Sequence, residues 1–224
     1  MLAAYHLVGW WPVRGSEVLF ALAGVWLGAW AADLVTGSVH WACDTWGDER
    51  TRFFGTRLIR GFREHHDAPR AMLEHDWIEV NSEPAAAACA AFALLALPPV
   101  QEWLDSRVFL AAFVWSLAVM GASANQIHQW SHDPAPARWV AWLQRTGLVL
   151  TPARHARHHR APHESDYCIA GGWLNPALDA VGFWRALERT VTRLSGATPR
   201  CGTAHQNRAA MVPPDPPHSE AQRR

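Results

Sequence analysis

The chain has 224 residues, half of them are hydrophobic, and its formal net charge at pH 7 is zero. A balanced charge offers no basic surface to a nucleic acid, so nucleic acid is not an expected partner. The four cysteines lack a CxxC spacing, which argues against a disulfide framework and against a cysteine-ligated zinc site.

Three apolar blocks, residues 18–35, 84–100 and 108–125, predict helices that cross a membrane, because each approaches the length of about 20 residues that spans a bilayer. The middle block is the weakest, since it is alanine-rich and ends at Pro98-Pro99. Residues 137–150 predict an interfacial helix, with Trp139 and Trp142 at the headgroup level. We therefore expect an all-α fold: an integral membrane helical bundle of three to four spans with a cytoplasmic histidine-rich cap. Three buried helices of a soluble protein are the alternative.

Arginine placement predicts the orientation of these spans. Six arginines lie within residues 36–83 and twelve follow residue 126, whereas only Arg14 and Arg107 lie elsewhere. Because arginine is enriched on the cytoplasmic side, both arginine-rich parts are expected there, at the inner membrane if the source is bacterial. The first sixteen residues do not resemble a cleaved signal peptide. We expect a membrane domain over residues 1–195 and a disordered tail over 196–224.

The segment TPARHARHHRAPH, residues 151–163, concentrates four histidines. Thr151 followed by Pro152 is a favourable helix start, and Pro162 disfavours helix at the residue before it. His155, His158 and His159 therefore lie on one helical face, with His163 just beyond the break. A basic surface helix is the alternative, since three arginines are interleaved. After it, residues 168–188 start with a glycine turn and Asn175-Pro176 and then predict an amphipathic helix that lies on the bilayer.

Ten histidines form two sets that both begin where a predicted span reaches the cytoplasmic side. One set follows the first span and the other follows the third, so the two can meet at the membrane surface. His128 and His132 are spaced i, i+4 and share a helical face. The candidate metal ligands are His40, His65, His66, His128, His132, His155, His158, His159 and His163, of which His128, His132, His155, His158 and His159 are the strongest catalytic candidates.

Asp44, His75 and Asn125 are candidates for outer-sphere or direct ligands, because metal-bound imidazoles usually donate their second N–H to a polar partner. His6, His205 and His218 are not expected to bind metal. So many imidazoles exceed the three or four protein ligands of a zinc site and would suit two metal ions. Fe, Zn, Cu and Ni all remain compatible with imidazole ligands. A group of pH-sensitive surface histidines is the alternative.

The motifs HWACDTWG, FREHHDAP, HDWIEVN, NQIHQWSH, HARHHRAPHE and YCIAGGWLNPAL resemble, in this order, the lipid desaturase family that includes plasmanylethanolamine desaturase. The resemblance implies an integral membrane enzyme with a histidine-bound pair of Fe ions, O2 as co-substrate and an external electron donor, a cytochrome b5 or a ferredoxin. It implies a membrane phospholipid substrate: a 1-O-alkyl ether lipid that becomes a vinyl ether, a plasmalogen. Two departures are Ser82-Glu83-Pro84 after IEVN and Arg154 before His155, where the family often has Gly-Asn and a further His.

Three hypotheses follow. The favoured one is a desaturase of ether phospholipids, with an acyl-lipid (phosphatidylglycerol-type) desaturase as its variant. The second is a membrane hydroxylase with the same metal site. The third is a non-catalytic metal-binding or adaptor protein of the membrane.

Overall fold

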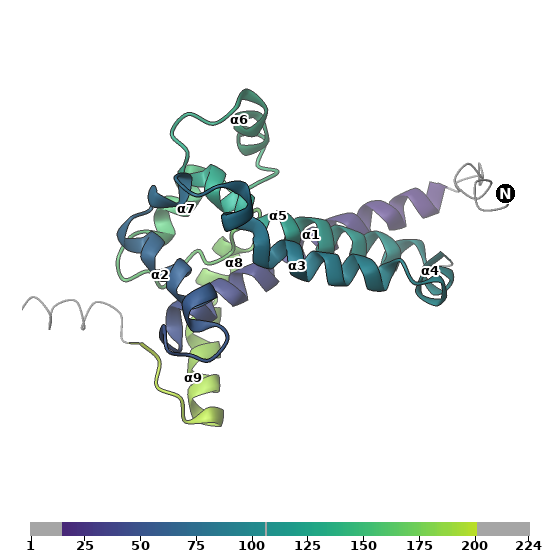
Figure 1. Cartoon of the computed structure of the whole chain (residues 1–224). Coiled ribbons are helices and arrows are strands. Elements are labelled where there is room, and N and C mark those ends of the chain that lie inside the picture. Colours follow the sequence, from purple (N-terminus) through teal and green to yellow (C-terminus); the bar gives the residue numbers. More distant parts are fainter. Residues whose placement is uncertain (1–14, 106, 201–224) are drawn as a thin grey trace, which may run out of the picture.

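The computed structural model describes residues 15–105 and 107–200, and these residues form helices and connecting loops without a strand (Figure 1). Two helices are long and apolar enough to cross a membrane, α1 (Gly15–Thr45) and α5 (Val108–His132). A third span exists if α3 (Trp77–Leu95) and α4 (Pro98–Asp105) count together, although they meet at a bend of 78°. The predicted all-α, membrane-integral fold is thereby confirmed, with two or three spans among the described residues.

Small residues allow α1 and α5 to pack closely. Gly24 and Gly28 lie one turn apart on α1, and a methyl group added to either would collide with the backbone of α5 at Phe109 or Phe113. The Ser116 hydroxyl donates a hydrogen bond of 2.7 Å to the Val25 carbonyl across the same contact. Close backbone approach through small residues is a common way for helices to associate in lipid.

Helix α3 differs from the predicted span over residues 84–100. It begins earlier, because Asp76 caps its first turn and Glu79 completes a capping box, and it ends at Leu95 ahead of Pro98-Pro99. Pro84 lies inside the helix and has no N–H to donate to the Val80 carbonyl. The Asn125 side chain of α5 donates to that carbonyl instead, at 2.9 Å. This bond joins α3 to α5 where the predicted histidine-rich part of α5 begins.

The remaining helices gather at one end of the long helices (Figure 1). They are η2 (Gly55–Ile59), α2 (Arg60–Asp67), η3 (Ala71–Leu73), α6 (Arg138–Arg145), α7 (Pro152–His158), α8 (Asn175–Ala180) and α9 (Phe183–Ser195). Helix α6 carries exposed Trp139 and Trp142, as the interfacial prediction requires. Thr151 caps α7 through the Arg154 N–H, as predicted from the sequence.

The glycine turn predicted at the start of residues 168–188 is present, but the amphipathic helix predicted after it is divided in two. Residues 168–174 are irregular, and two short helices, α8 and α9, follow. Gly172 and Gly182 both have a φ of +64°, a conformation that interrupts helix and favours glycine.

Asp33 holds this irregular segment against α1. Its carboxylate is fully buried and accepts hydrogen bonds from the backbone N–H groups of Gly171 at 2.8 Å, Gly172 at 2.9 Å and Leu174 at 3.3 Å. The side chain of Asn175 bonds both the N–H and the carbonyl of Cys168. The cap is thus tied to a membrane-spanning helix by a charged group whose partners are backbone donors. Most of the first sixteen residues, where no cleaved signal peptide is expected, and most of the predicted tail lie outside the described residues.

Candidate metal centre

Four separate helices bring their histidines to one place. His40 and Asp44 lie on the last turns of α1, His65 and His66 on α2, and His128 and His132 on the last turns of α5. Helix α7 and the residue after it contribute three more rings, those of His155, His158 and His159. The two histidine sets that are far apart in the sequence therefore meet at the end of the membrane helices.

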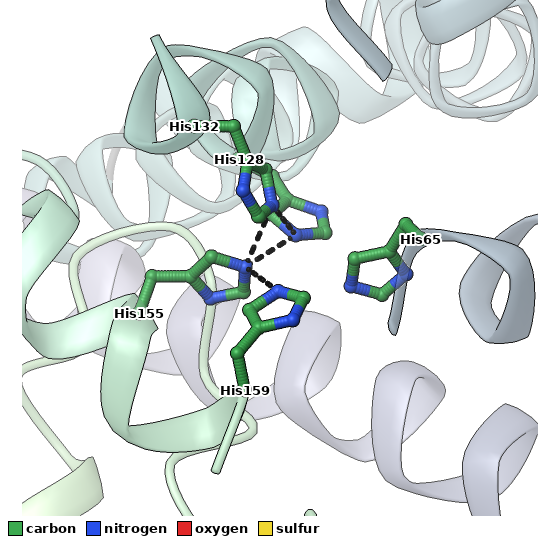
Figure 2. Close-up of side chains that lie close together, drawn as sticks. All are labelled: His65, His128, His132, His155 and His159. Carbon is green, nitrogen blue, oxygen red and sulfur yellow. Dashed lines mark hydrogen bonds between the residues drawn. The ribbon is translucent and has the colours of Figure 1, made fainter. Parts of the chain in front are cut away.

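The first histidine group consists of five rings that surround one point (Figure 2), and its members are His65, His128, His132, His155 and His159. The Nε2 atom of His155 lies 2.8 Å from that of His128, 3.0 Å from that of His132 and 2.9 Å from that of His159. The Nε2 atoms of His128 and His132 lie 3.3 Å apart.

These distances fit ligands of one metal ion. Nitrogens about 2.1 Å from an ion lie about 3.0 Å apart at right angles and about 3.4 Å apart at tetrahedral angles. Hydrogen bonding alone cannot satisfy the group, because a neutral imidazole carries a single N–H. Four Nε2 atoms that all face one another therefore call for a cation between them.

The second histidine group consists of His40, His65, His66 and His158, and a carboxylate lies among its rings. Oδ2 of Asp44 lies 3.3 Å from Nε2 of His40, 3.2 Å from that of His66 and 3.5 Å from that of His158. The Nε2 atoms of His40, His65 and His158 are buried without a hydrogen-bond partner, as is Oδ1 of Asp44. Unsatisfied buried donors and acceptors are costly, and a bound cation would satisfy them together.

Backbone carbonyls orient two rings of the second group. Nδ1–H of His40 donates to the Tyr167 carbonyl at 3.1 Å, and Nδ1–H of His158 donates to the Ser165 carbonyl at 2.7 Å. Because a carbonyl only accepts, these bonds place the proton on Nδ1 and leave each Nε2 lone pair free for a metal. Both carbonyls belong to the loop that precedes the segment held by Asp33.

Burial keeps the rings in the cap neutral. Burial first, and neighbouring imidazoles second, lowers the pKa of His65 and His155 well below 6.5. The same two causes lower the pKa of His159 to about 3. Since a metal ligand must be an unprotonated imidazole, these rings are ready to bind an ion at neutral pH without releasing a proton.

Three sequence candidates lie outside both groups. Nδ1 of His163 lies 3.1 Å from Nδ1 of His66 and 3.0 Å from the His158 carbonyl, so His163 borders the second group. His75 is exposed and pairs with Glu79 at 3.1 Å. The amide of Asn125 donates to the Val80 carbonyl.

Sequence reasoning missed the backbone carbonyls that orient His40 and His158 and the tether made by Asp33. Glu64 and Glu164 flank the histidines in the sequence, but they pair with Arg60 and Arg185. A carbonyl leaves no trace in the residue pattern, whereas a single Asp within an apolar span could have drawn attention to Asp33.

The arrangement suits metal-dependent redox chemistry beside a membrane. His65 belongs to both groups, so the two groups adjoin. The donors are imidazoles with one carboxylate, a set that accepts iron readily, and among the described residues no thiolate takes part. The neighbouring helices are long and apolar enough to place this centre at the lipid surface.

Comparison with known proteins agrees with this chemistry. Residues 29–202 match the family model of the lipid desaturase domain. The chain is 39% identical over 191 residues to plasmanylethanolamine desaturase 1 of Mus musculus, an alignment that covers 84% of this chain and 70% of the relative. It is also 39% identical over 189 residues to plasmanylethanolamine desaturase of Myxococcus xanthus, with 84% and 66% covered.

A further relative is the chloroplastic fatty acid desaturase 4 of Arabidopsis thaliana, at 36% identity over 183 residues, with 80% of this chain and 54% of the relative covered. The chain thus spans about two thirds of the length of the two plasmanylethanolamine desaturases and about half of the plant protein. No solved structure matches it. Since the domain model matches most of the chain, and the histidine-rich motifs assemble at the end of membrane helices, the protein is a membrane enzyme of the lipid desaturase family.

Proposed function

We propose that this enzyme is an O2-dependent di-iron desaturase that converts 1-O-alkyl (plasmanyl) phospholipids into vinyl ether lipids, the plasmalogens. One observation carries the proposal: two adjoining histidine groups lie at the end of membrane helices in a chain that is 39% identical to plasmanylethanolamine desaturases over 84% of its length.

In this proposal, each histidine group holds one iron ion. His128, His132, His155 and His159 would hold the first, while His40, His66, His158 and Asp44 would hold the second. His65 is within reach of either. The bound irons would supply the reduction of O2 that removes two hydrogens from neighbouring carbons of the alkyl chain, and water is formed.

The protein's own groups keep the site ordered and dry. His40, His128, His155 and His158 are almost fully buried, which limits the access of water to the ligand nitrogens. The carbonyls of Tyr167 and Ser165 hold the second group in the ligating tautomer. His163 and Asn125 would act indirectly, by supporting His66 and by joining α3 to α5.

The proposal includes three features that rest on sequence patterns. The active site faces the cytoplasm, because the arginines cluster on the histidine side. Electrons come from a cytochrome b5 or ferredoxin type of protein, as the family resemblance implies. The catalytic domain comprises residues 1–195, and residues 196–224 form a tail.

Product analysis tests the reaction. The chain is expressed in cells supplied with an alkyl ether lipid, and acid-labile vinyl ether lipids are sought by mass spectrometry. Wild type should form them, His132→Ala and His158→Ala should not, and the matched control His218→Ala should behave as wild type. Product in both site variants would contradict the assignment.

The same measurement separates the alternatives. An acyl-lipid desaturase would yield unsaturated lipid that resists acid, and a hydroxylase would yield lipid one oxygen heavier. Metal content without any O2-dependent lipid product would indicate a non-catalytic protein.

A further inference from the structure

The two histidine groups differ in the charge that they offer to an ion. Oδ2 of Asp44 lies among the rings of the second group, 3.3 Å from Nε2 of His40 and 3.2 Å from Nε2 of His66. The first group consists of imidazoles and contains no carboxylate among the described residues. Because ligating imidazoles are neutral, a divalent ion would keep both of its charges at the first position and only one at the second. Uncompensated charge is costly in a buried site, so the second position should bind an ion more tightly.

The rings of the two groups also differ in how they are oriented. In the second group, backbone carbonyls accept hydrogen bonds from Nδ1–H of His40 at 3.1 Å and of His158 at 2.7 Å. In the first group, the Nδ1 atoms of His155 and His159 are buried and have no hydrogen-bond partner among the described residues. Partners of this kind fix the ring orientation, and their loss typically lowers metal affinity about 10–100-fold. Orientation therefore favours the same position as charge.

The number of donors does not decide between the positions. His65 belongs to both groups, and without it each position keeps four donors. These are His128, His132, His155 and His159 at the first position, and His40, His66, His158 and Asp44 at the second. Charge and ring orientation are thus the properties that distinguish the two positions in affinity.

Access from outside distinguishes the positions in the opposite sense. His65 and His128, both members of the first group, line a cavity of about 710 Å³ between α2, the first turns of α3 and the end of α5. Asp44 and the rings that belong to the second group alone do not line this cavity. Among them, the side chains of His40 and His158 are fully buried. A small molecule that enters the cavity therefore reaches the first position.

From these differences, and resting on the function proposed above, we infer that the two iron positions have different tasks. The second position fills first and retains its iron, which fixes the ends of α1, α2 and α7 against one another. The first position fills second, releases its iron more readily and is the position at which O2 meets iron.

Metal binding by the full chain, purified in detergent and freed of metal, tests the inference without requiring turnover. Ferrous iron alone is titrated with oxygen excluded, and native mass spectrometry counts the ions bound to each chain. Wild type should bind two ions in two steps whose dissociation constants differ by about 10-fold or more. A titration that follows the binding curve of two equivalent sites would overturn the inference.

Two variants assign the steps to the positions. His159→Ala should keep the tight step and lose the weak one, whereas Asp44→Asn should lose the tight step and keep one weakly bound ion. His75→Ala is the matched control and should bind as wild type, because His75 is exposed, pairs with Glu79 and belongs to neither group. Loss of the tight step in His159→Ala together with its retention in Asp44→Asn would reverse the assignment and overturn the inference.

Nitric oxide tests the access of small molecules, because it binds ferrous iron at positions that are open to O2 and gives a characteristic EPR signal. With one equivalent of iron in wild type, the signal should be weak, and it should develop as the second equivalent is added. A full signal at one equivalent would show that the tightly bound ion is the accessible one, and it would overturn the inference.

These measurements separate the inference from the proposed reaction. If iron and nitric oxide bind as expected but the loaded enzyme makes no vinyl ether, the reaction is wrong and the difference between the positions stands. If vinyl ether forms while the two positions bind iron equally, the inference is wrong and the reaction stands.

Discussion

Replacing Asp33 removes the tether between α1 and residues 171–174 and changes none of the proposed metal ligands. Asp33→Ala leaves the N–H groups of Gly171, Gly172 and Leu174 without their acceptor, and the two glycines are buried. An unsatisfied buried donor costs about 1–3 kcal/mol. We therefore expect a loss of about 3–6 kcal/mol in the free energy of unfolding, or a fall of roughly 10 °C in the melting temperature.

Asp33→Asn should have a smaller effect. Its carbonyl oxygen can still accept from the N–H groups of Gly171 and Gly172. Only the N–H of Leu174, whose bond is longer at 3.3 Å, would then face the NH2 group of the amide, which cannot accept. A loss of about 1–2 kcal/mol is expected. The order of melting temperatures is then wild type, Asn variant and Ala variant.

The assay is thermal unfolding of the detergent-solubilised protein, together with metal analysis of the same samples. Metal content should fall in Asp33→Ala, because the displaced segment adjoins the Ser165 and Tyr167 carbonyls that orient His158 and His40. The exposed Glu49→Ala serves as the control and should melt as wild type. An Ala variant with the melting temperature and metal content of wild type would refute the reasoning.

Three further predictions concern other parts of the molecule. Asp44→Asn should lower the iron content from about two to about one per chain, because the rings that Asp44 contacts all belong to the second histidine group. An unchanged iron content in elemental analysis would contradict this prediction. Gly28→Ala should lower the free energy of unfolding by about 3 kcal/mol, because the added methyl group forces α1 and α5 apart. Gly121→Ala is the control, because its methyl group meets open space. Equal melting temperatures of the two variants would argue against the close packing. The metal-free protein should lose stability as the pH falls from 7 to 5, because His155 takes up a proton near pH 6.5 in the unfolded chain but stays neutral when buried in the folded chain. This residue contributes up to about 2 kcal/mol to the loss. A free energy of chemical unfolding that does not change with pH would disprove the prediction.

Much of the centre could be predicted because helical spacing and membrane sidedness are local properties. The i, i+4 pair His128 and His132 and the His155–His159 face follow from a period of about 3.6 residues. The meeting of the two sets follows from their shared side of the membrane, and the cap on α7 follows from Thr151 and Pro152.

The rest depends on contacts between distant residues. No periodicity reveals that Asn125 replaces the donor that Pro84 lacks, or that Asp33 binds backbone 138 residues away. The break at Gly182 was not predicted because the apolar spacing after Asn175 resembles that of one helix, whereas the positive φ of Gly182 divides it.

The double membership of His65 has a consequence for how a two-iron centre would work. One ring nitrogen can serve only one ion at a time, yet four histidines remain around the first position without it, and three histidines with Asp44 remain around the second. Either ion could therefore give up its bond to His65 and stay bound through its remaining ligands. Irons that change oxidation state in every cycle would also change their coordination number. Binding and release of His65 would allow that change while the helices stay in place.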